Sequence, residues 1–590
     1  MAGPGIECAP YQEVAERFPG IAREEFARAV RFIEPDGTVT SGAHAAFRCL
    51  AASPSWRWLH WAYRHAPGFG PAAEGVYRFI ARRRGVFSRL TGWLWGSQGP
   101  LRGADRYHAS SWLFVRGLAL VYAAAFLSLA PQIAALVGDR GIAPAGDMLA
   151  AWKEVGPSAL VEAPTLGWLA LSDGLLKAAC FAGAAASAAL FLGVLPGPVA
   201  SLIWVLYLSL ATLGGVFLRF QWDALLLETG FLALFLVRWR GPFVSWRARG
   251  LPPAAHGLAR LLIFKLMFSS GVVKLSSGDE AWWGLHALDF HYETQPLPTV
   301  IGWWAHQLPA AFQRVSVLGM FVVELVLPFF IFLPRRLRHL AAGAFVTLQV
   351  LIMATGNYGF FNLISIVLVL LLVDDAAWRS LARRPLPAPA VPALPRPWRV
   401  RRLLAAPFLV LFVLLHLVQI GASLRRPMPW IGPLRPALAA LAPFHVCNSY
   451  GLFSVMTDRR REIIVEGSRD GRTWQAYPFR YKPGPVDAAP RWTGPHMPRL
   501  DWQMWFAALG PPGASPWFGA FAAALLEGRG PVLALLPSNP FPGEPPRYLR
   551  ARLYDYRFTT SAEREATGHW WEREPLGLYL PPVTRRSETP

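Results

Sequence analysis

The segment 276–311 concentrates side chains that can transfer protons or bind metal ions. These side chains are Asp279, Asp289, His291, Tyr292, Glu293 and His306. His291 and Glu293 lie two positions apart, so they would share one face of a strand but point apart on a helix. Pro296 and Pro298 favour an extended chain, which would bring the imidazole and the carboxylate together. Such a pair can act in acid–base catalysis or supply two metal ligands.

A structural role competes with this chemistry. Two ligands and a distant His306 are fewer than a protein metal site usually has, so we predict no metal site here. We interpret the segment as a loop, rich in Tyr and Trp, that caps a helical bundle at a membrane surface. His291 and Glu293 are kept as candidate catalytic residues.

A second group of ionisable residues lies inside apolar runs. Its members are Glu228, Lys265 and Glu324, and Arg219 and Asp223 lie at the edge of the run that contains Glu228. A charge inside a membrane is costly and usually has a partner or a function. We expect Lys265 to pair with Glu228 or Glu324 and to fix the packing of helices. A proton or substrate path is the alternative, but no repeated half-structure indicates a transporter.

Complete catalytic signatures are absent from the sequence. There is no GxSxG, no Walker loop and no CxxC, and the four cysteines, Cys8, Cys49, Cys180 and Cys447, have no metal-binding spacing. We therefore predict a protein that is not an enzyme and needs no cofactor, with a membrane enzyme as the alternative.

The elements that position these residues are membrane spans. Hydrophobic residues make up 53% and charged residues 16% of the 590 residues, as in membrane proteins. A span needs about 20 apolar residues. The sequence predicts nine: 112–136, 176–194, 198–218, 222–238, 257–275, 312–333, 338–355, 359–373 and 403–421. The fourth and eighth are short.

The distribution of arginine predicts the orientation of these spans. Four Arg clusters lie before the first span, between the fourth and fifth, between the sixth and seventh, and between the eighth and ninth. With the N-terminus inside, all four are cytoplasmic, and the Arg-poor loops 137–175 and 276–311 are outside. The net charge of +21 therefore indicates a lipid bilayer rather than nucleic acid as the partner. Residues 385–400 form a Pro-rich linker before the last span.

A different pattern begins near residue 445. Residues 461–467 and 474–481 alternate as strands around the turn signal Asp470-Gly471, and 548–558 predicts a third strand. Residues 501–509 and 516–536 are expected to be helices. We predict a soluble β-rich domain over 445–583, either α+β or a β-sandwich, on the outer side of the membrane.

Tryptophan is frequent in this domain. Most of its Trp side chains are expected in the core, and the alternative is an aromatic surface that recognises another protein. The candidates for such contacts are Trp474, Trp502, Trp505, Trp570 and Trp571.

Several long stretches resemble the lipase maturation factor family over about residues 107–583. They include WDALLLETGFL (222–232), FSSGVVKLSSGDEAWW (268–283), NYGFFNLISIVLVLLLVDD (357–375) and TGHWWEREPLGLYLP (567–581). The resemblance implies a membrane-anchored factor that helps exported proteins, lipases among them, to fold. Its eukaryotic members lie in the endoplasmic reticulum membrane, whereas the Ala-, Arg- and Pro-rich composition here indicates a bacterial cytoplasmic membrane.

Two shorter resemblances suggest alternatives. Residues 7–88 are similar to the later part of DCC-type thiol–disulfide oxidoreductase domains, which implies a truncated, thioredoxin-like region over 1–90 on the cytoplasmic side. The CxxC of that family is missing, and Cys8 has no partner two residues away. Residues 270–284 resemble vitamin K-dependent carboxylases, in which the residue that corresponds to Lys274 acts as a base. A membrane enzyme and a redox fusion protein are therefore the alternatives to a maturation factor.

Overall fold

A computed structural model describes residues 6–52, 56–95, 107–239, 252–382, 399–425 and 429–585. The chain divides into two compact units, residues 1–100 and 101–590. The Pro-rich linker predicted at 385–400 lies almost wholly outside the described residues.

The first unit is mainly helical. Its short antiparallel hairpin joins β1 (Arg31–Ile33) and β2 (Val39–Ser41), and the main helices are α3 (Gly42–Ala51), α4 (Arg57–His65), α5 (Phe69–Arg82) and α6 (Arg84–Trp95). Asp36 forms the turn because its carboxylate accepts the Thr38 backbone N–H at 2.9 Å, and Gly37 takes a φ of 87°. Glu74 ties the helices together by accepting hydrogen bonds from the His44 backbone N–H and the Tyr63 hydroxyl.

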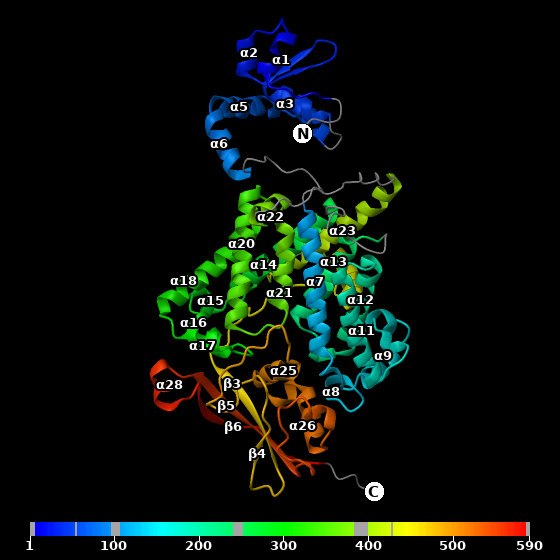
Figure 1. The fold of residues 1–590 in the computed structure, drawn as a ribbon, viewed down its shortest axis with the longest axis vertical. Helices are drawn as coiled ribbons and strands as arrows, with labels where there is room; N and C mark the ends of the chain where they lie inside the picture. Colours follow the sequence, from blue (N-terminus) through cyan, green and yellow to red (C-terminus); the bar gives the residue numbers. More distant parts are fainter. Residues whose placement is uncertain are drawn as a thin grey trace. The chain divides into compact units, whose positions relative to one another are not determined.

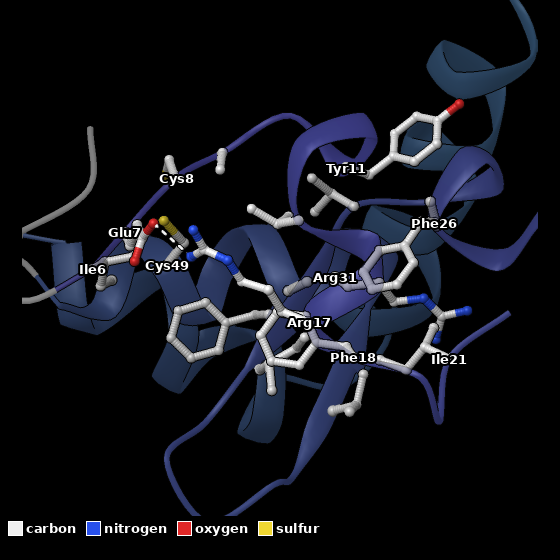
Figure 2. A pocket seen from close by; sticks show the side chains of 18 of the residues that line it. Ile6, Glu7, Cys8, Tyr11, Arg17, Phe18, Ile21, Phe26, Arg31 and Cys49 are labelled. Carbon is white, nitrogen blue, oxygen red and sulfur yellow. Dashed lines mark hydrogen bonds and ion pairs between the residues drawn. The ribbon is translucent and has the colours of Figure 1, made fainter. Parts of the chain in front are cut away.

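A cavity of about 1560 Å³ opens in this unit (Figure 2). Apolar side chains such as Phe18, Ile21 and Phe26 line it beside arginines. Cys8 and Cys49 both line the cavity, although 40 residues separate them in the sequence. Burial raises the pKa of the Cys49 thiol. No local spacing of cysteines in the sequence indicates this arrangement.

The second unit contains a bundle of long helices. They are α7 (His108–Leu129), α11 (Asp173–Leu192), α12 (Pro196–Leu213), α13 (Gln221–Leu236), α14 (Pro253–Ser276), α18 (Ala310–Phe321), α20 (Arg335–Thr355), α21 (Phe361–Val369) and α23 (Arg399–Ala422). Figure 1 shows these helices side by side, with the C-terminal domain at one end. Each of the nine predicted segments is therefore largely helical.

Fewer of these helices qualify as membrane spans by length and composition. Within the described ranges five do, namely 108–129, 173–192, 196–213, 310–330 and 335–355, and six do if the bent pair Phe361–Leu372 and Asp375–Leu381 counts as one span. The expectation of nine spans is thus not confirmed. α13 has only 16 residues, and α14 carries Arg260, Lys265 and Lys274.

A π-helical turn, Val322–Val326, interrupts the span at 310–330. Pro328 explains it, because a proline has no N–H to bond the carbonyl four residues earlier, which here is that of Glu324. The widened turn contains the buried Glu324 side chain.

The C-terminal domain is a single antiparallel sheet with helices on one face (Figure 1). The strand order is β4-β3-β5-β6, with β3 (Arg460–Ser468), β4 (Gln475–Ala476), β5 (Tyr548–Phe558) and β6 (Trp571–Thr584). The helices α25 (Arg499–Ala508) and α26 (Pro516–Leu526) contribute Trp502, Phe518 and Phe521 to the core. In the described part of the domain the architecture is α+β rather than a β-sandwich.

The edges of this sheet differ from the sequence prediction. The strand expected at 474–481 is reduced to two residues, because Pro478, two positions beyond its end, cannot donate to the ladder. β6 was not predicted, since Pro575, Pro581 and Pro582 obscure its alternation. It forms an edge strand with three register irregularities, which blunt it against further strand pairing.

Candidate functional site

The site is built where the C-terminal domain meets the bundle and the loop between α14 and α18. We call this set of contacts the docking interface. The loop has three short helices: α15 (Glu280–Trp283), α16 (Leu288–Thr294) and α17 (Val300–His306). The predicted outer loops 137–175 and 276–311 both lie on the side of the C-terminal domain, because Gly141 and Glu293 accept hydrogen bonds from Arg529 and Arg460 of that domain.

A buried ion pair joins α25 to the bundle. Arg499 donates to both carboxylate oxygens of Asp223, at 2.7 and 2.8 Å, and also to the Phe217 carbonyl oxygen at 2.8 Å. The Tyr207 hydroxyl donates to the same carboxylate at 2.5 Å. Both charged side chains are about 1% exposed. A two-pronged pair of this kind fixes the orientation of its partners as well as their distance.

Glu228 forms a second junction, between three helices and the chain that enters the domain. Its carboxylate accepts hydrogen bonds from the Lys265 ammonium at 2.5 Å, the Tyr450 hydroxyl at 2.6 Å and the Asn448 backbone N–H at 3.0 Å. His416 Nε2 of α23 lies 3.1 Å from it. The buried Glu228 carboxylate, with its hydrogen bonds satisfied, therefore links α13, α14, α23 and residues 448–450.

Arg460 at the start of β3 holds the loop. Its guanidinium donates to the carbonyl oxygens of Glu293, Gln295 and Pro296, and to the Glu462 carboxylate at 2.5 Å. These carbonyls are free because Pro296 and Pro298 end α16 and leave the following chain extended. Arg460 is 1% exposed, so the contact is part of the core.

Lys274 in the last turn of α14 is also fully engaged. Its ammonium donates to Glu324 at 2.7 Å and to the Ser270 carbonyl oxygen at 3.0 Å, and it lies 5.4 Å from the Trp282 ring centre. Glu324 is thus bonded to Lys274, whereas Lys265 is bonded to Glu228. Lys274 is 6% exposed and buried among these partners.

His291 and Glu293 do not form a pair. The chain is helical through Thr294 rather than extended, so the two side chains point apart, which corrects the expectation based on the prolines. His291 Nε2 lies 3.2 Å from the Tyr358 hydroxyl, and burial lowers the pKa of His291 to about 4. Glu293 accepts the Phe558 backbone N–H of β5 at 2.8 Å, and burial raises its pKa to about 7. His306, not His291, lies near Glu293, at 3.8 Å.

No three His, Cys, Asp or Glu residues are arranged to hold a metal ion in the described parts of the chain.

The candidate tryptophans are placed mainly in packing positions. Trp502, Trp505 and Trp571 are 3%, 8% and 1% exposed, and the Trp505 indole donates to the Thr294 carbonyl oxygen of the loop. Trp570 packs on Trp303 with the Arg564 guanidinium 3.8 Å from its ring centre. Trp474 is half-buried, with the guanidinium of Arg550 4.1 Å from its ring centre. In this conformation Trp474 and Trp570 retain exposed surface.

Sequence reasoning missed Arg499, Arg460 and Asn357, which carry much of the docking interface. Asn357 donates to the Arg491 carbonyl oxygen at 2.8 Å and accepts the Thr493 backbone N–H at 2.7 Å. The one available signal was Asp223, an acidic residue at the edge of an apolar run that required a cationic partner. Its partner lies 276 residues further along the chain, and no local pattern identifies it.

Helices able to cross a membrane, with a sheet domain locked to one end of them by buried polar contacts, define a polytopic membrane protein with an oriented soluble domain. Two family models match this chain: the lipase maturation factor transmembrane domain over residues 109–380 and the lipase maturation factor C-terminal domain over residues 446–581. The chain belongs to the lipase maturation factor family.

Curated relatives agree with this assignment. Lipase maturation factor 2 of Gallus gallus is 38% identical, over 80% of this chain and 81% of its own length. Lipase maturation factor 2 of Homo sapiens is 37% identical, over 80% and 82%, and lipase maturation factor 1 of Bos taurus is 34% identical, over 80% and 89%. No solved structure matches. These comparisons support neither the enzyme nor the redox alternative, and the redox-domain resemblance of residues 7–88 is not shown by them.

Proposed function

We propose that this protein is a membrane-anchored maturation factor that holds an incompletely folded lipase, or another exported protein, against its C-terminal domain. The observation that carries the proposal is the docking interface, together with membership of the family. Buried pairs such as Arg499–Asp223 fix the domain to the bundle, so the domain forms an oriented platform beside the membrane. Binding of a non-native client lowers its tendency to aggregate until it folds.

The surface proposed for the client is the uncovered half of the sheet. Strand register places Arg550, Arg552 and Leu578 on the face opposite α25, together with Arg573. Ile464 and Tyr554 lie on the same face at the border of the uncovered half, where they join the cluster under the loop. The loop covers the other half, where Trp303 and Tyr292 pack with Phe558 and Trp571. We call the uncovered half, with Trp474, the open sheet face.

The chemistry of the open sheet face suits an acidic and apolar segment. The guanidiniums of Arg552 and Arg573 lie 5.4 and 4.9 Å from the centre of the Tyr554 ring. The register also places Glu466 and Glu462 on this face, and both are already paired, Glu466 with Arg550 at 2.6 Å and Glu462 with Arg460 and Lys482. Leu578 is 54% exposed beside them. Two arginines without a carboxylate partner among the described residues therefore favour an anionic side chain on the client.

A photo-reactive amino acid at Leu578 of the full-length protein tests this proposal. Leu578 is preferable to Trp505, which is buried. Cross-linking in cells that produce a secreted lipase should capture incompletely folded lipase at position 578. The same group at Glu565, an exposed position on α28 (Ser561–Thr567), is the matched control. Equal capture at both positions, or capture of folded lipase alone, contradicts the proposal.

We also propose that α13, α14 and α23 cross the membrane and that the bent pair Phe361–Leu372 and Asp375–Leu381 forms one span. Together with the five qualifying helices this gives nine crossings, with the N-terminus inside and the C-terminal domain outside, in a bacterial cytoplasmic membrane. The charges that disqualify α14 by composition are bonded to partners, Lys265 to Glu228 and Lys274 to Glu324. The support for orientation is the Arg-poor character of the loops beside the C-terminal domain.

A cysteine introduced at exposed Glu565 should react with an impermeant maleimide from the periplasmic side in intact cells. Reaction only after lysis contradicts this orientation.

A further inference from the structure

Short helices with exposed apolar side chains precede two candidate spans on the side of the C-terminal domain. α17 is the clearest example. Ile301 and Trp304 are each 55% exposed and Leu308 is 41% exposed, at spacings of three and four residues that place them on one face. The opposite face is buried, with Trp303 1% exposed. The seven-residue helix is far too short to cross a bilayer.

The exposed face of α17 continues into the exposed apolar surface of a candidate span. The candidate span 310–330 begins a few residues later, and its Phe312, Val315 and Leu318 are 52%, 69% and 53% exposed. A membrane protein shields such side chains with acyl chains. No polar residue lies between Leu308 and Phe312, so the exposed apolar surface is continuous from the candidate span onto the end of α17.

The other outer loop repeats this arrangement on the far side of the bundle. The short helix α10 (Ala159–Glu162) exposes Leu160 and Val161, at 60% and 53%, and Leu169 is 85% exposed just before α11. Lys153, Glu154 and Glu162 accompany them, so this loop is amphipathic. The neighbouring α9 (Ala145–Val155) and α17 lie on opposite sides of the bundle (Figure 1). A patch that served a single bound protein would be confined to one side, whereas a bilayer surrounds the bundle.

We propose that α10 and α17, with Leu169, lie in the headgroup region of the bilayer leaflet nearest the C-terminal domain. Tryptophan and long aliphatic side chains beside polar residues are the composition that this region favours. The inference does not depend on the proposed function. The occupant of these faces is lipid, and a second copy of the chain is an outcome that the test distinguishes.

This placement connects the bilayer to the sheet. The buried face of α17 carries Trp303, which packs on Trp570 at 5.4 Å between ring centres, and Gln307, which donates to the Thr559 carbonyl oxygen at 3.2 Å. A lipid-bound α17 therefore holds the end of β5 at the level of the headgroups. The open sheet face extends from that end along the strands, away from the loop.

Depth-dependent fluorescence quenching tests the proposal with the full-length protein. Ile301→Cys, labelled with an environment-sensitive fluorophore, is reconstituted into phosphatidylcholine vesicles that carry nitroxides at the headgroup or at chain position 5 or 12. Leu578→Cys, equally exposed but on the sheet, is the matched control. The signal of the unsubstituted protein, in which Cys8 is exposed, is subtracted. Leu169→Cys tests the opposite side of the bundle.

The proposal predicts that Ile301→Cys and Leu169→Cys are quenched more by the headgroup and position-5 nitroxides than by position 12, and that Leu578→Cys is quenched by none. Water-like emission and full access to iodide at Ile301→Cys would overturn it. Protection from iodide without quenching by any nitroxide would also overturn it, because protein and not lipid would then cover α17.

Discussion

Burial, rather than neighbouring charge, determines the protonation of Glu293, and this has a consequence for stability. Its side chain is 14% exposed, and burial raises its pKa from 4.5 to about 7. The folded state therefore holds a proton that the unfolded chain releases between these values. The stabilisation from this group is complete below about pH 4.5 and is lost as pH rises through about 7.

Glu293→Gln should remove this pH dependence, because glutamine imitates the protonated acid and can still accept the Phe558 N–H. Between pH 5 and 8 the stability of the wild type should fall relative to the variant by about 2–3 kcal/mol. The measurement is the thermal unfolding of both proteins in detergent across this range. Their difference isolates Glu293 from the histidines His291 and His306, whose lowered pKa values act in the opposite direction. Parallel pH profiles would contradict the prediction, and Glu565→Gln, at an exposed site, serves as the control.

Lys274 and Glu324 should behave as one unit. Lys274→Met leaves the Glu324 carboxylate buried without its cation, and removal of one member of a buried pair typically costs about 3–5 kcal/mol. The double variant Lys274→Met/Glu324→Gln leaves no uncompensated charge, so we expect it to recover most of that loss. Unfolding in detergent of the wild type, both single variants and the double variant gives the coupling energy. Additive effects would show that the two side chains do not depend on each other.

At the scale of elements, the capping of α17 links the loop to the end of α20. Thr299 is 2% exposed, and its hydroxyl accepts the Gly302 N–H and donates to the Ala354 carbonyl oxygen, both at 2.9 Å. The same hydroxyl therefore begins one helix and binds the last turn of another.

Thr299→Val keeps the shape of the side chain but removes both bonds. We expect a loss of about 1–2 kcal/mol in local stability, together with faster amide hydrogen exchange in α17 and at the end of α20. Exchange measured by mass spectrometry on the reconstituted protein would reveal it. The Thr347→Val variant is the control, since the Thr347 hydroxyl bonds only within α20 at an exposed position. An effect of equal size in the control would mean that the capping of α17 has no special role.

Elements with a regular local pattern could be predicted from the sequence. The strand predicted at 548–558 coincides with β5, because its alternating residues face the core and the opposite side in turn. α25 was also predicted within two residues of its observed bounds. α16 was not predicted. Pro296 and Pro298 were interpreted as evidence for an extended chain at His291 and Glu293, whereas they only end the helix after Thr294. β6 was not predicted, because prolines usually argue against a strand, whereas an edge strand tolerates them.

The contacts of the candidate site could be predicted from the sequence less well than the helices and strands. The pairing of Lys265 with Glu228 joins residues 37 positions apart, and the pairing of Arg499 with Asp223 joins residues 276 positions apart. A sequence shows that a buried charge needs a partner, but the partner is selected by tertiary packing. Burial of Trp505 also depends on tertiary packing. The sequence allowed it a place on the surface, whereas in the structure it lies under the loop.

At the scale of the whole molecule, the bundle and the loop leave one half of the sheet uncovered on a domain that buried ion pairs and hydrogen bonds attach to the bundle. A client held there would be kept at a fixed orientation beside the membrane from which it emerges. Charge on the open sheet face should then control capture, because the guanidiniums of Arg552 and Arg573 both lie within 6 Å of the centre of the Tyr554 ring.

Arg552→Glu/Arg573→Glu should weaken capture of lipase by the photo-reactive group at Leu578. A hydrogen bond to a charged group contributes about 1.5–3 kcal/mol, which corresponds to about tenfold or more in affinity for each arginine that contacts the client. The matched control is Arg461→Glu/Arg472→Glu, which makes the same change of charge at exposed positions on or beside β3. Cross-linked lipase and secreted lipase activity should both fall in the first variant and persist in the control. An equal loss in both variants would mean that net charge matters and that the open sheet face does not.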